Sequence, residues 1–332
     1  MTQLLSTAPL CPPLLIQFLP EILDFSTPFA LSGAIKFLGT KRHQDKWLKD
    51  TENYVVKGCF AMTELGHGSN VKGIETVTTY DSNTGESVIN TPCESARKYC
   101  IGGAANHATK TVVFLQLEIN GKNQGVHTFI CQIMDADGKI CPNIQIADCG
   151  HKIRLNGADN GRIWKEENLL NLISKVSPDG EYLSAIKDPD QRFAAFMAPL
   201  TFGRVKIAST AVYISKVMMD LNLRAFFITP NGPKILLLDY PSHQRRLLYA
   251  MSSAASYMKM LYVNRTPQSN KTIHVISSTF KECGEACGGQ GLKIENHVDP
   301  LKSEFDVQST FEGDNNVLMQ QVNVHGLLSY KL

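Results

Sequence analysis

The stretch TVVFLQLEINGKNQGVHTFICQIM, residues 111–134, indicates the fold class of the chain around it. Its opening residues divide into two alternating sets, which are Thr111, Val113, Leu115 and Leu117 on one side and Val112, Phe114, Gln116 and Glu118 on the other. Successive side chains of a strand point to opposite faces, so this alternation predicts a β-strand. The turn residues Asn120-Gly121-Lys122-Asn123 follow, and the stretch therefore predicts a strand that ends in a turn.

A second hairpin signal follows the first. Residues 126–134 form another β-rich run, Asp137-Gly138 is a turn pair, and residues 140–146 supply a return strand. Together these patterns predict a β-domain that extends from about Lys57 to Asn171.

Helical patterns flank the β-rich part on both sides. Residues 24–48 have the pattern of short helices, with Gly39 as a stop. Beyond Asn171, apolar side chains recur at spacings near three and four from Phe193 onward, which is typical of helices. The order predicts an α+β multidomain protein with a partial N-terminal helical segment at 1–56, a central β-domain at 57–171 and a helical domain at 172–332.

Bulk composition bounds the partners. The chain has 332 residues, of which 43% are apolar, so it can bury the core of more than one domain. Its 33 basic and 31 acidic residues are mixed, and a formal charge of +2 provides no broad positive field for nucleic acid or acidic lipid. We expect neither partner.

Cysteine and histidine spacing argues against a metal site. The nine cysteines include no close CxxC pair, which argues against a disulfide framework or structural zinc. The histidines at 67, 107, 127 and 151 lack HxH or HxxxH spacing. We therefore predict no bound metal and interpret these histidines as packing or surface residues.

The N-terminal segment, residues 1–20, contains no charged side chain, which raises the question of a membrane span or a signal peptide. Prolines at 9, 12, 13 and 20 interrupt it, and no basic region precedes the apolar part. We expect no membrane span, and a segment that packs on the domain.

Three motifs have the composition of a ligand site. Cys59–Asn70, CFAMTELGHGSN, is an apolar strand that leads into a loop of glycines and small hydrogen-bonding residues, which lets backbone approach a flat ligand. Cys287–Gly291, CGGQG, follows a predicted helix, and its three glycines allow close backbone contact. Phe311–Asn316 sets Glu312 between an aromatic ring and a glycine, where a carboxylate can act as a base. No GxGxxG follows a strand, so a Rossmann site is not expected.

Two of these motifs also have a structural interpretation. Thr63-Glu64 is compatible with the start of a turn, and a Gly/Ser/Asn loop is more often structural than cofactor-binding. On the residues alone, Glu312 fits better in a solvated acidic turn shared with Asp314, or as an N-cap helper for the following helix, than as a base. On the residues alone these alternatives stay open.

The motifs resemble the acyl-CoA oxidases, relatives of the acyl-CoA dehydrogenases, and in detail they are similar to the plant peroxisomal branch. The resembling blocks follow the family's order at residues 59–76, 99–108, 147–164, 187–209, 237–248 and 305–322. The resemblance implies an acyl-CoA dehydrogenase-like fold with a shortened C-terminal helical bundle. It also implies FAD as cofactor and oxidation of an acyl-CoA to the trans-2-enoyl-CoA, with oxygen reduced to hydrogen peroxide, in fatty-acid β-oxidation.

The resemblance extends to single residues. Thr63 resembles the threonine that hydrogen-bonds the flavin, Gly102 the first glycine of the pair that lines it, and Glu312 the catalytic base. Other positions resemble cofactor contacts, which are Ser69, Gln290, Gly291 and, toward the FAD pyrophosphate of the other subunit, Arg224. The family further implies a homodimer in the peroxisome, although Ser329–Leu332 does not form a Ser-Lys-Leu address.

The chain also departs from the family pattern. Family members are longer, with a fuller N-terminal helical domain and a second C-terminal helical domain, and this chain has contractions after Trp164 and in its helical part. The alternative function is therefore a non-catalytic remnant that binds acyl-CoA or a full-length relative. A dehydrogenase is a third candidate, but the block Thr63–Gly68 looks like an oxidase.

Overall fold

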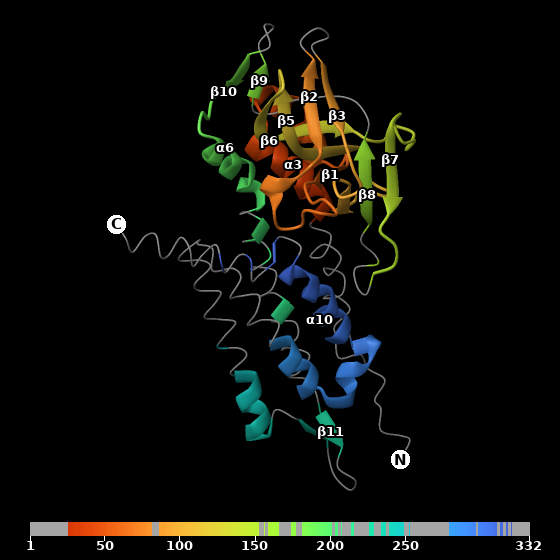
Figure 1. Cartoon of the computed structure of the whole chain (residues 1–332). Coiled ribbons are helices and arrows are strands. Elements are labelled where there is room, and N and C mark those ends of the chain that lie inside the picture. The colour runs from red at the N-terminus through yellow and green to blue at the C-terminus, as the bar shows by residue number, and fades with distance from the viewer. Residues whose placement is uncertain are drawn as a thin grey trace, which may run out of the picture. The chain divides into compact units, whose positions relative to one another are not determined.

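The structure is a computed structural model, drawn in Figure 1. It describes residues 26–81, 86–152, 156, 159–165, 174–176, 181–200, 203–204, 207, 214–215, 226–228, 234–236, 239–248, 252, 279–296, 298–310, 313–314, 317 and 320. The chain divides into two compact units. We call residues 24–199 the β unit, and residues 1–23 with 200–332 the helical unit.

The main sheet of the β unit is built on a long antiparallel pair, β5 (Lys110–Ile119) and β6 (Lys122–Gln132). Asn120 and Gly121 join them with φ values of 51° and 74°, as a type I′ turn requires. The other edge of β5 pairs in parallel with two strands in succession. These are β1 (Gly58–Ala61) and β2 (Val77–Asp81), and β3 (Glu86–Asn90) pairs antiparallel with β2.

A second sheet of three antiparallel strands packs on one face of the main sheet. Its order is β4 (Lys98–Gly102), β8 (Asn160–Lys165), β7 (Ile144–Asp148). Apolar side chains of both sheets share one buried core, to which β5 contributes Val113, Leu115, Leu117 and Ile119. This packing carries Gly102, at the end of β4, close to the core.

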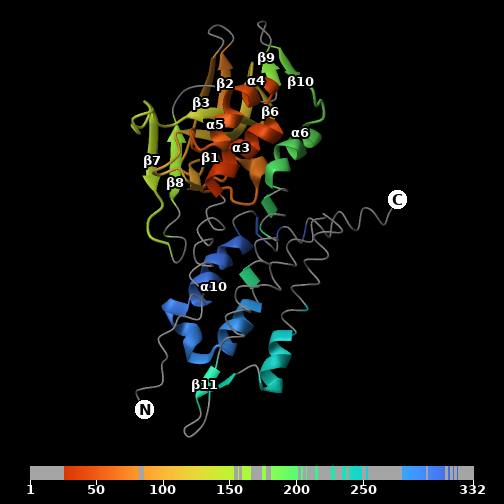
Figure 2. The ribbon, with the colours of Figure 1, turned by 180° about the vertical axis from the view of Figure 1, so that it is seen from behind.

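Helices cover the opposite face of the main sheet, as Figure 2 shows. Helix α3 (Ser26–Leu38) packs against Val112 and Phe114, the β5 residues of the other parity. It ends at the predicted stop, Gly39, a position where any Cβ would collide with the Ile35 carbonyl oxygen. Helix α4 (Lys41–His43), a π-helical turn (Gln44–Leu48) and α5 (Lys49–Glu52) then lead toward β1.

A small hairpin and one helix complete the described β unit. The hairpin is β9 (Ser174–Val176) with β10 (Tyr182–Ser184), and the helix is α6 (Pro189–Phe196). The Asp188 side chain accepts the Asp190 N–H at 3.0 Å and caps the helix. Arg192 is buried and donates to the carbonyl oxygens of Gln124 and Ile186 at 2.9 and 3.2 Å, which ties α6 to the start of β6.

The described part of the helical unit consists of short elements. These are β11 (Phe226–Ile228) paired with β12 (Lys234–Leu236), helices at 241–248 and 279–286, 3₁₀ turns at Gly288–Leu292, Ile294–Asn296 and Val307–Ser309, and α10 (Val298–Asp306). Phe280 packs edge-to-face on Phe305 of α10, with ring centroids 4.8 Å apart. Arg246 bonds Glu282 and Glu285, each at 2.8 Å, and so joins 241–248 to 279–286.

Most local predictions are confirmed, and one pairing is wrong. The strand at 111–118, the helical pieces before Gly39 and the helix before Cys287 are all present. The second hairpin is reduced to a single bridge between Met134 and Ile140, and β7 pairs with β8 instead. Pro142 has no N–H to donate and Asn143 adopts a φ of 57°, so the chain turns away from β6 there.

The α+β class is confirmed by the two units. The division at residues 56 and 171 stays a prediction, and so does the shortened C-terminal bundle, much of which lies outside the described residues. None of the helices in the described part of the chain combines the length and apolar character needed to cross a bilayer.

Candidate active site

The first candidate motif leaves β1 and pairs with the chain that leads into β4. Thr63 is half-buried, and its carbonyl oxygen accepts the Tyr99 N–H at 3.0 Å. The N–H groups of Leu65 and Gly66 donate to the carbonyl oxygens of Arg97 and Ser95, both at 2.9 Å. Because Tyr99 lies on the strand that ends at half-buried Gly102, the structure brings the Thr63 segment and the Gly102 strand together.

A buried ion pair lies beside Thr63. The Glu64 and Lys98 side chains are 0% and 3% exposed, and Lys98 Nζ lies 2.8 Å from Glu64 Oε1. Burial would raise the pKa of Glu64, but the Lys98 charge and hydrogen bonds from Lys98, Thr76 and the Glu75 N–H bring it below its ordinary value. Burial lowers the pKa of Lys98 to about 8, and Glu64 acts against that shift.

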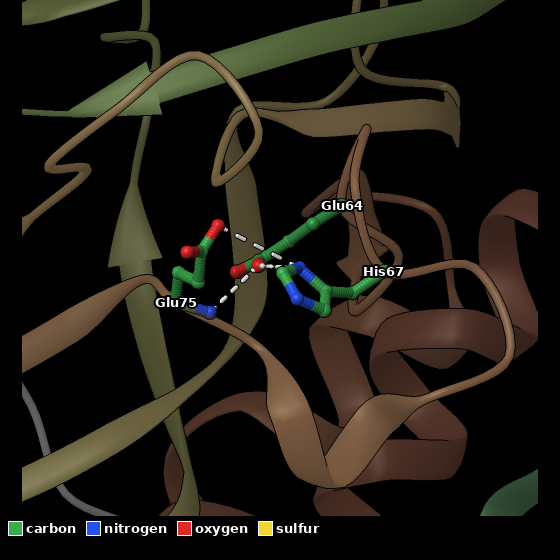
Figure 3. Close-up of side chains that lie close together, drawn as sticks. All are labelled: Glu64, His67 and Glu75. Atoms are coloured by element: carbon green, nitrogen blue, oxygen red, sulfur yellow. Dashed lines mark hydrogen bonds and ion pairs between the residues drawn. The ribbon is translucent and has the colours of Figure 1, made fainter.

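Glu64 also takes part in a three-residue cluster, drawn in Figure 3. His67 Nδ1 lies 3.2 Å from Glu64 Oε2 and 3.8 Å from Glu75 Oε2, and Glu64 Oε2 accepts the Glu75 N–H at 2.7 Å. His67 Nδ1 is shielded from solvent and forms no hydrogen bond. The interpretation of His67 as a packing or surface residue stays a prediction, and Glu75 comes close to it through a turn that the sequence did not reveal.

The donor atoms of this cluster lie within 4.8 Å of one another, a spacing that a metal ion can bridge. However, Glu64 is already neutralised by Lys98, and its oxygens accept the Thr76 hydroxyl at 2.6 Å and the Thr76 N–H at 3.0 Å. The carboxylate is therefore satisfied by the protein itself, and we assign no metal to the cluster. The absence of a metal stays a prediction.

Gly102, the second candidate residue, is followed by a turn that Asp159 holds in place. Gly103 has a φ of 78° and donates its N–H to the Asp159 carbonyl oxygen at 2.7 Å. The Asp159 carboxylate accepts the N–H groups of residues 105, 106 and 107 and lies 3.0 Å from His107 Nδ1. A polar hollow beside the turn is lined by Asn106, His107, Asp148, Gly150, His151, Lys152, Asn156 and Asp159. Such walls suit a polar group rather than an acyl chain.

The remaining predicted residues are distributed over both units. Ser69 is exposed in an open loop of the β unit. Gly291 is buried in the helical unit, where a Cβ would collide with the Gly284 carbonyl oxygen, so the contact of the chain with itself already requires glycine there. Gln290 next to it is half-buried, while Arg224 and Glu312 lie outside the described residues. The roles of these residues stay predictions.

Sequence reasoning did not single out Lys98. The resembling block begins at Tyr99, one residue later, and a lone lysine before an apolar strand has the appearance of a surface residue. The available signal was Glu64 in the middle of an otherwise apolar and glycine-rich motif, because a carboxylate there needs a cationic partner when it is buried.

Comparisons with known proteins give a consistent result. Residues 269–326 match the family model described as "Acyl-CoA oxidase, C-alpha1 domain". The chain is 67% identical to peroxisomal acyl-coenzyme A oxidase 3 of Arabidopsis thaliana, over 89% of this chain and 48% of that protein. It is 34% identical to human peroxisomal acyl-coenzyme A oxidase 3, over 90% and 49%.

Solved structures agree with the sequences. Acyl-CoA oxidase 1 of Arabidopsis thaliana superposes with a TM-score of 0.73 at 30% identity, covering 91% of this chain and 51% of that one. Acyl-CoA oxidase-1 of Caenorhabditis elegans, solved with FAD and ATP, superposes with a TM-score of 0.71 at 26% identity, over 90% and 50%. The chain spans about half the length of the relatives it matches. By sequence and by its acyl-CoA dehydrogenase-like α+β fold, this chain belongs to the acyl-CoA oxidase family.

Proposed function

We propose that this chain forms the flavin-binding and catalytic part of a peroxisomal acyl-CoA oxidase. The reaction is the FAD-dependent oxidation of an acyl-CoA to the trans-2-enoyl-CoA, with oxygen reduced to hydrogen peroxide. The observation that carries the proposal is 67% identity over 89% of the chain, a stretch long enough to extend into both units. We propose the peroxisome as its compartment because these relatives are named peroxisomal, and a homodimer because the chain resembles the family.

The β unit fits a flavin in two respects. Thr63 carries a hydroxyl just after the end of β1. Gly102 lies on the strand paired with this segment, and because it has no side chain, a flat ligand can approach its backbone closely. FAD bound there would supply the acceptor for the β-hydride of the substrate and a route for the electrons to oxygen. We propose Thr63 and Gly102 as flavin contacts, with Ser69, Gln290, Gly291 and Arg224 as further cofactor contacts.

Glu312 is the proposed general base. Its carboxylate takes the α-proton of the thioester as the β-hydride leaves, and hydrogen bonds to the thioester carbonyl stabilise the enolate-like charge. A carboxylate can serve as this base when an apolar, water-free surface beside it raises its affinity for the proton. Phe311, the neighbouring residue in the sequence, can supply such a surface. The oxidase assignment, rather than a dehydrogenase, rests on the block Thr63–Gly68.

The test is the stoichiometry of the reaction. The purified chain is supplied with FAD, a saturated acyl-CoA and air, and enoyl-CoA and hydrogen peroxide are both measured. We expect the two products in equal amounts. Enoyl-CoA without peroxide, formed only when an electron-accepting dye is added, would instead identify a dehydrogenase.

A further inference from the structure

Lys98 is a buried cation whose every donor is used. Its ammonium group donates to Glu64 Oε1 at 2.8 Å, to the Met62 carbonyl oxygen at 3.2 Å and to the Phe114 carbonyl oxygen at 2.7 Å. An ammonium group has three N–H donors, and each has an acceptor here. A neutral amine has only two donors, and its lone pair would face an acceptor, so this arrangement fits the charged form.

These bonds are placed on both sides of one residue. Met62 precedes Thr63 and Glu64 follows it, and Lys98 binds both neighbours. Thr63 itself is held through its carbonyl oxygen by the N–H of Tyr99, the residue after Lys98. The third bond, to Phe114, fixes the ammonium group to the central strand β5.

Lys98 also begins the strand that ends at Gly102. One side chain thus connects the segment of the proposed flavin-contacting hydroxyl with the strand of the proposed flavin-contacting glycine. The charges near it are Glu64, which it contacts, and then His67 and Glu75, which lie beyond Glu64. Thr76 donates to the same Glu64 Oε1 that Lys98 binds, and the Glu75 N–H donates to Oε2, so the carboxylate is fixed in place and cannot follow a displaced lysine.

We propose that Lys98 is a positioning residue for the flavin site, which holds the Thr63 hydroxyl in register with Gly102 by binding Met62 and Glu64 on either side of it. This inference rests on the proposed function, because Thr63 and Gly102 are flavin contacts only there. The competing view is that the ion pair stabilises the β unit generally and has no special effect on Thr63.

The experiment compares two substitutions of the same kind. Lys98→Met alone would leave the Glu64 carboxylate buried without its cation, so the informative variant is the double change Lys98→Met/Glu64→Gln, which removes both charges. The matched control is Lys110→Met, since Lys110 lies in the same unit and bonds Gln132 Oε1 rather than the Thr63 segment. All proteins are full-length, and folding is verified by circular dichroism.

Two readouts separate positioning from general stability. We expect the double variant to bind FAD at least tenfold more weakly, with a shifted absorption band of the flavin that does bind, and Lys110→Met to match wild type. We also expect the Tyr99 amide, which bonds the Thr63 carbonyl oxygen, to exchange hydrogen at least tenfold faster in the double variant while amides of β5 and β6 keep their rates.

A folded double variant with FAD affinity within twofold of wild type and an unchanged spectrum would overturn the inference. Global unfolding of that variant would overturn it as well, because the pair would then be a requirement of the whole unit. If wild type binds no FAD, the proposed function fails. The hydrogen-exchange experiment still tests whether Lys98 and Glu64 hold the Thr63 segment in place. A faster Tyr99 amide would support the hold on Thr63, and an unchanged one would refute it.

Discussion

His127 illustrates how a single buried side chain connects three elements. Its Nε2 lies 2.7 Å from the Tyr182 hydroxyl of β10, its Nδ1 lies 2.9 Å from the Gly125 carbonyl oxygen, and its ring packs on Phe196 of α6. Burial lowers the pKa of His127 to about 4, and the nearby Arg192 charge acts in the same direction. The imidazole is therefore neutral in the folded protein.

We predict that the β unit loses stability in acid because of this residue. The unfolded chain takes up the His127 proton near pH 6.5 and the folded one near 4, so stability falls as the pH drops from 6.5 to 4. The difference corresponds to roughly 3 kcal/mol. Urea unfolding at several pH values measures it, and His127→Gln should show a shallower slope. Exposed His151→Gln is the control, and an equal slope in both variants would contradict the prediction.

The contacts of individual side chains were harder to predict from the sequence than the secondary structure was. The composition of Cys59–Asn70 indicated a ligand site, and the structure does bring Thr63 next to the strand of Gly102. The buried partners of this motif were missed, because Lys98 and Glu75 meet Glu64 only through pairing with β4 and a turn. Contacts of this kind depend on which strands pair with each other, and a short stretch of sequence does not show that.

At the scale of elements, the contact between α3 and β1 requires a glycine at position 58, whereas the glycine at position 33 of α3 has free space around it. A Cβ on Gly58 of β1 would collide with the Leu31 side chain of α3, close to its root, so Leu31 cannot swing away. A Cβ on Gly33, inside α3, meets nothing within 4 Å. The same substitution should therefore have opposite effects at the two positions.

We predict that Gly58→Ala lowers the free energy of unfolding by about 1 to 3 kcal/mol, the usual cost of overpacking a core. Gly33→Ala should raise it by about 0.5 to 1 kcal/mol, because alanine restricts the unfolded chain and favours the helix. Denaturant unfolding of wild type and of both variants measures the two effects. Each variant serves as the control for the other, because both carry the same change from glycine to alanine. Equal effects of the two changes would mean that α3 does not pack on β1 in this way.

Local periodicity explains which elements were predictable. The alternation in β5 separates its two faces correctly, since Val113, Leu115 and Leu117 enter the core between the sheets and Val112 and Phe114 face α3. The pairing of β7 was not predictable, because a strand's partner is set by packing and not by its own pattern. Pro142 was the one local sign that the expected hairpin would fail.

At the scale of the whole molecule, the reactivity of the cysteines shows whether the cores of both units are closed to solvent. Cys59 and Cys131 are buried in the β unit, and Cys283 and Cys287 in the helical unit. Burial raises the pKa of Cys59 and of Cys283 to about 12. Partial burial of the thiol, together with the neighbouring Cys149, raises the pKa of Cys100 to about 11. Because the thiolate is the reactive form, these thiols should be slow to react.

We predict that a thiol reagent labels Cys93 first among the cysteines of the described residues, since Cys93 is exposed. Cys59 and Cys283 should react only after denaturant is added. Labelling followed by peptide mass spectrometry gives the rate at each position, with the denatured chain as control. Rapid labelling of Cys283 in the native chain would show that the core around Phe280 and Phe305 is not closed.

The family assignment depends on the whole chain, whereas the catalytic assignment depends on a few residues. Similarity extends over 89% of the sequence, and the ordered blocks of motifs indicate the family by themselves. The roles of Glu312 and Arg224 rest only on resemblance to the family, as both residues lie outside the described residues. Chemistry is therefore the decisive test of the proposed base.

The most direct measurement is the visible spectrum of the purified chain with FAD, recorded without air before and after an acyl-CoA is added, with Glu312→Gln beside it. We predict a flavin spectrum that bleaches in wild type. In the variant the flavin binds equally well and bleaches about 10² to 10⁴ times more slowly, the usual range for the loss of a general base. Equal bleaching in both proteins would contradict the role of Glu312, and no bound flavin in wild type would contradict the proposed function itself.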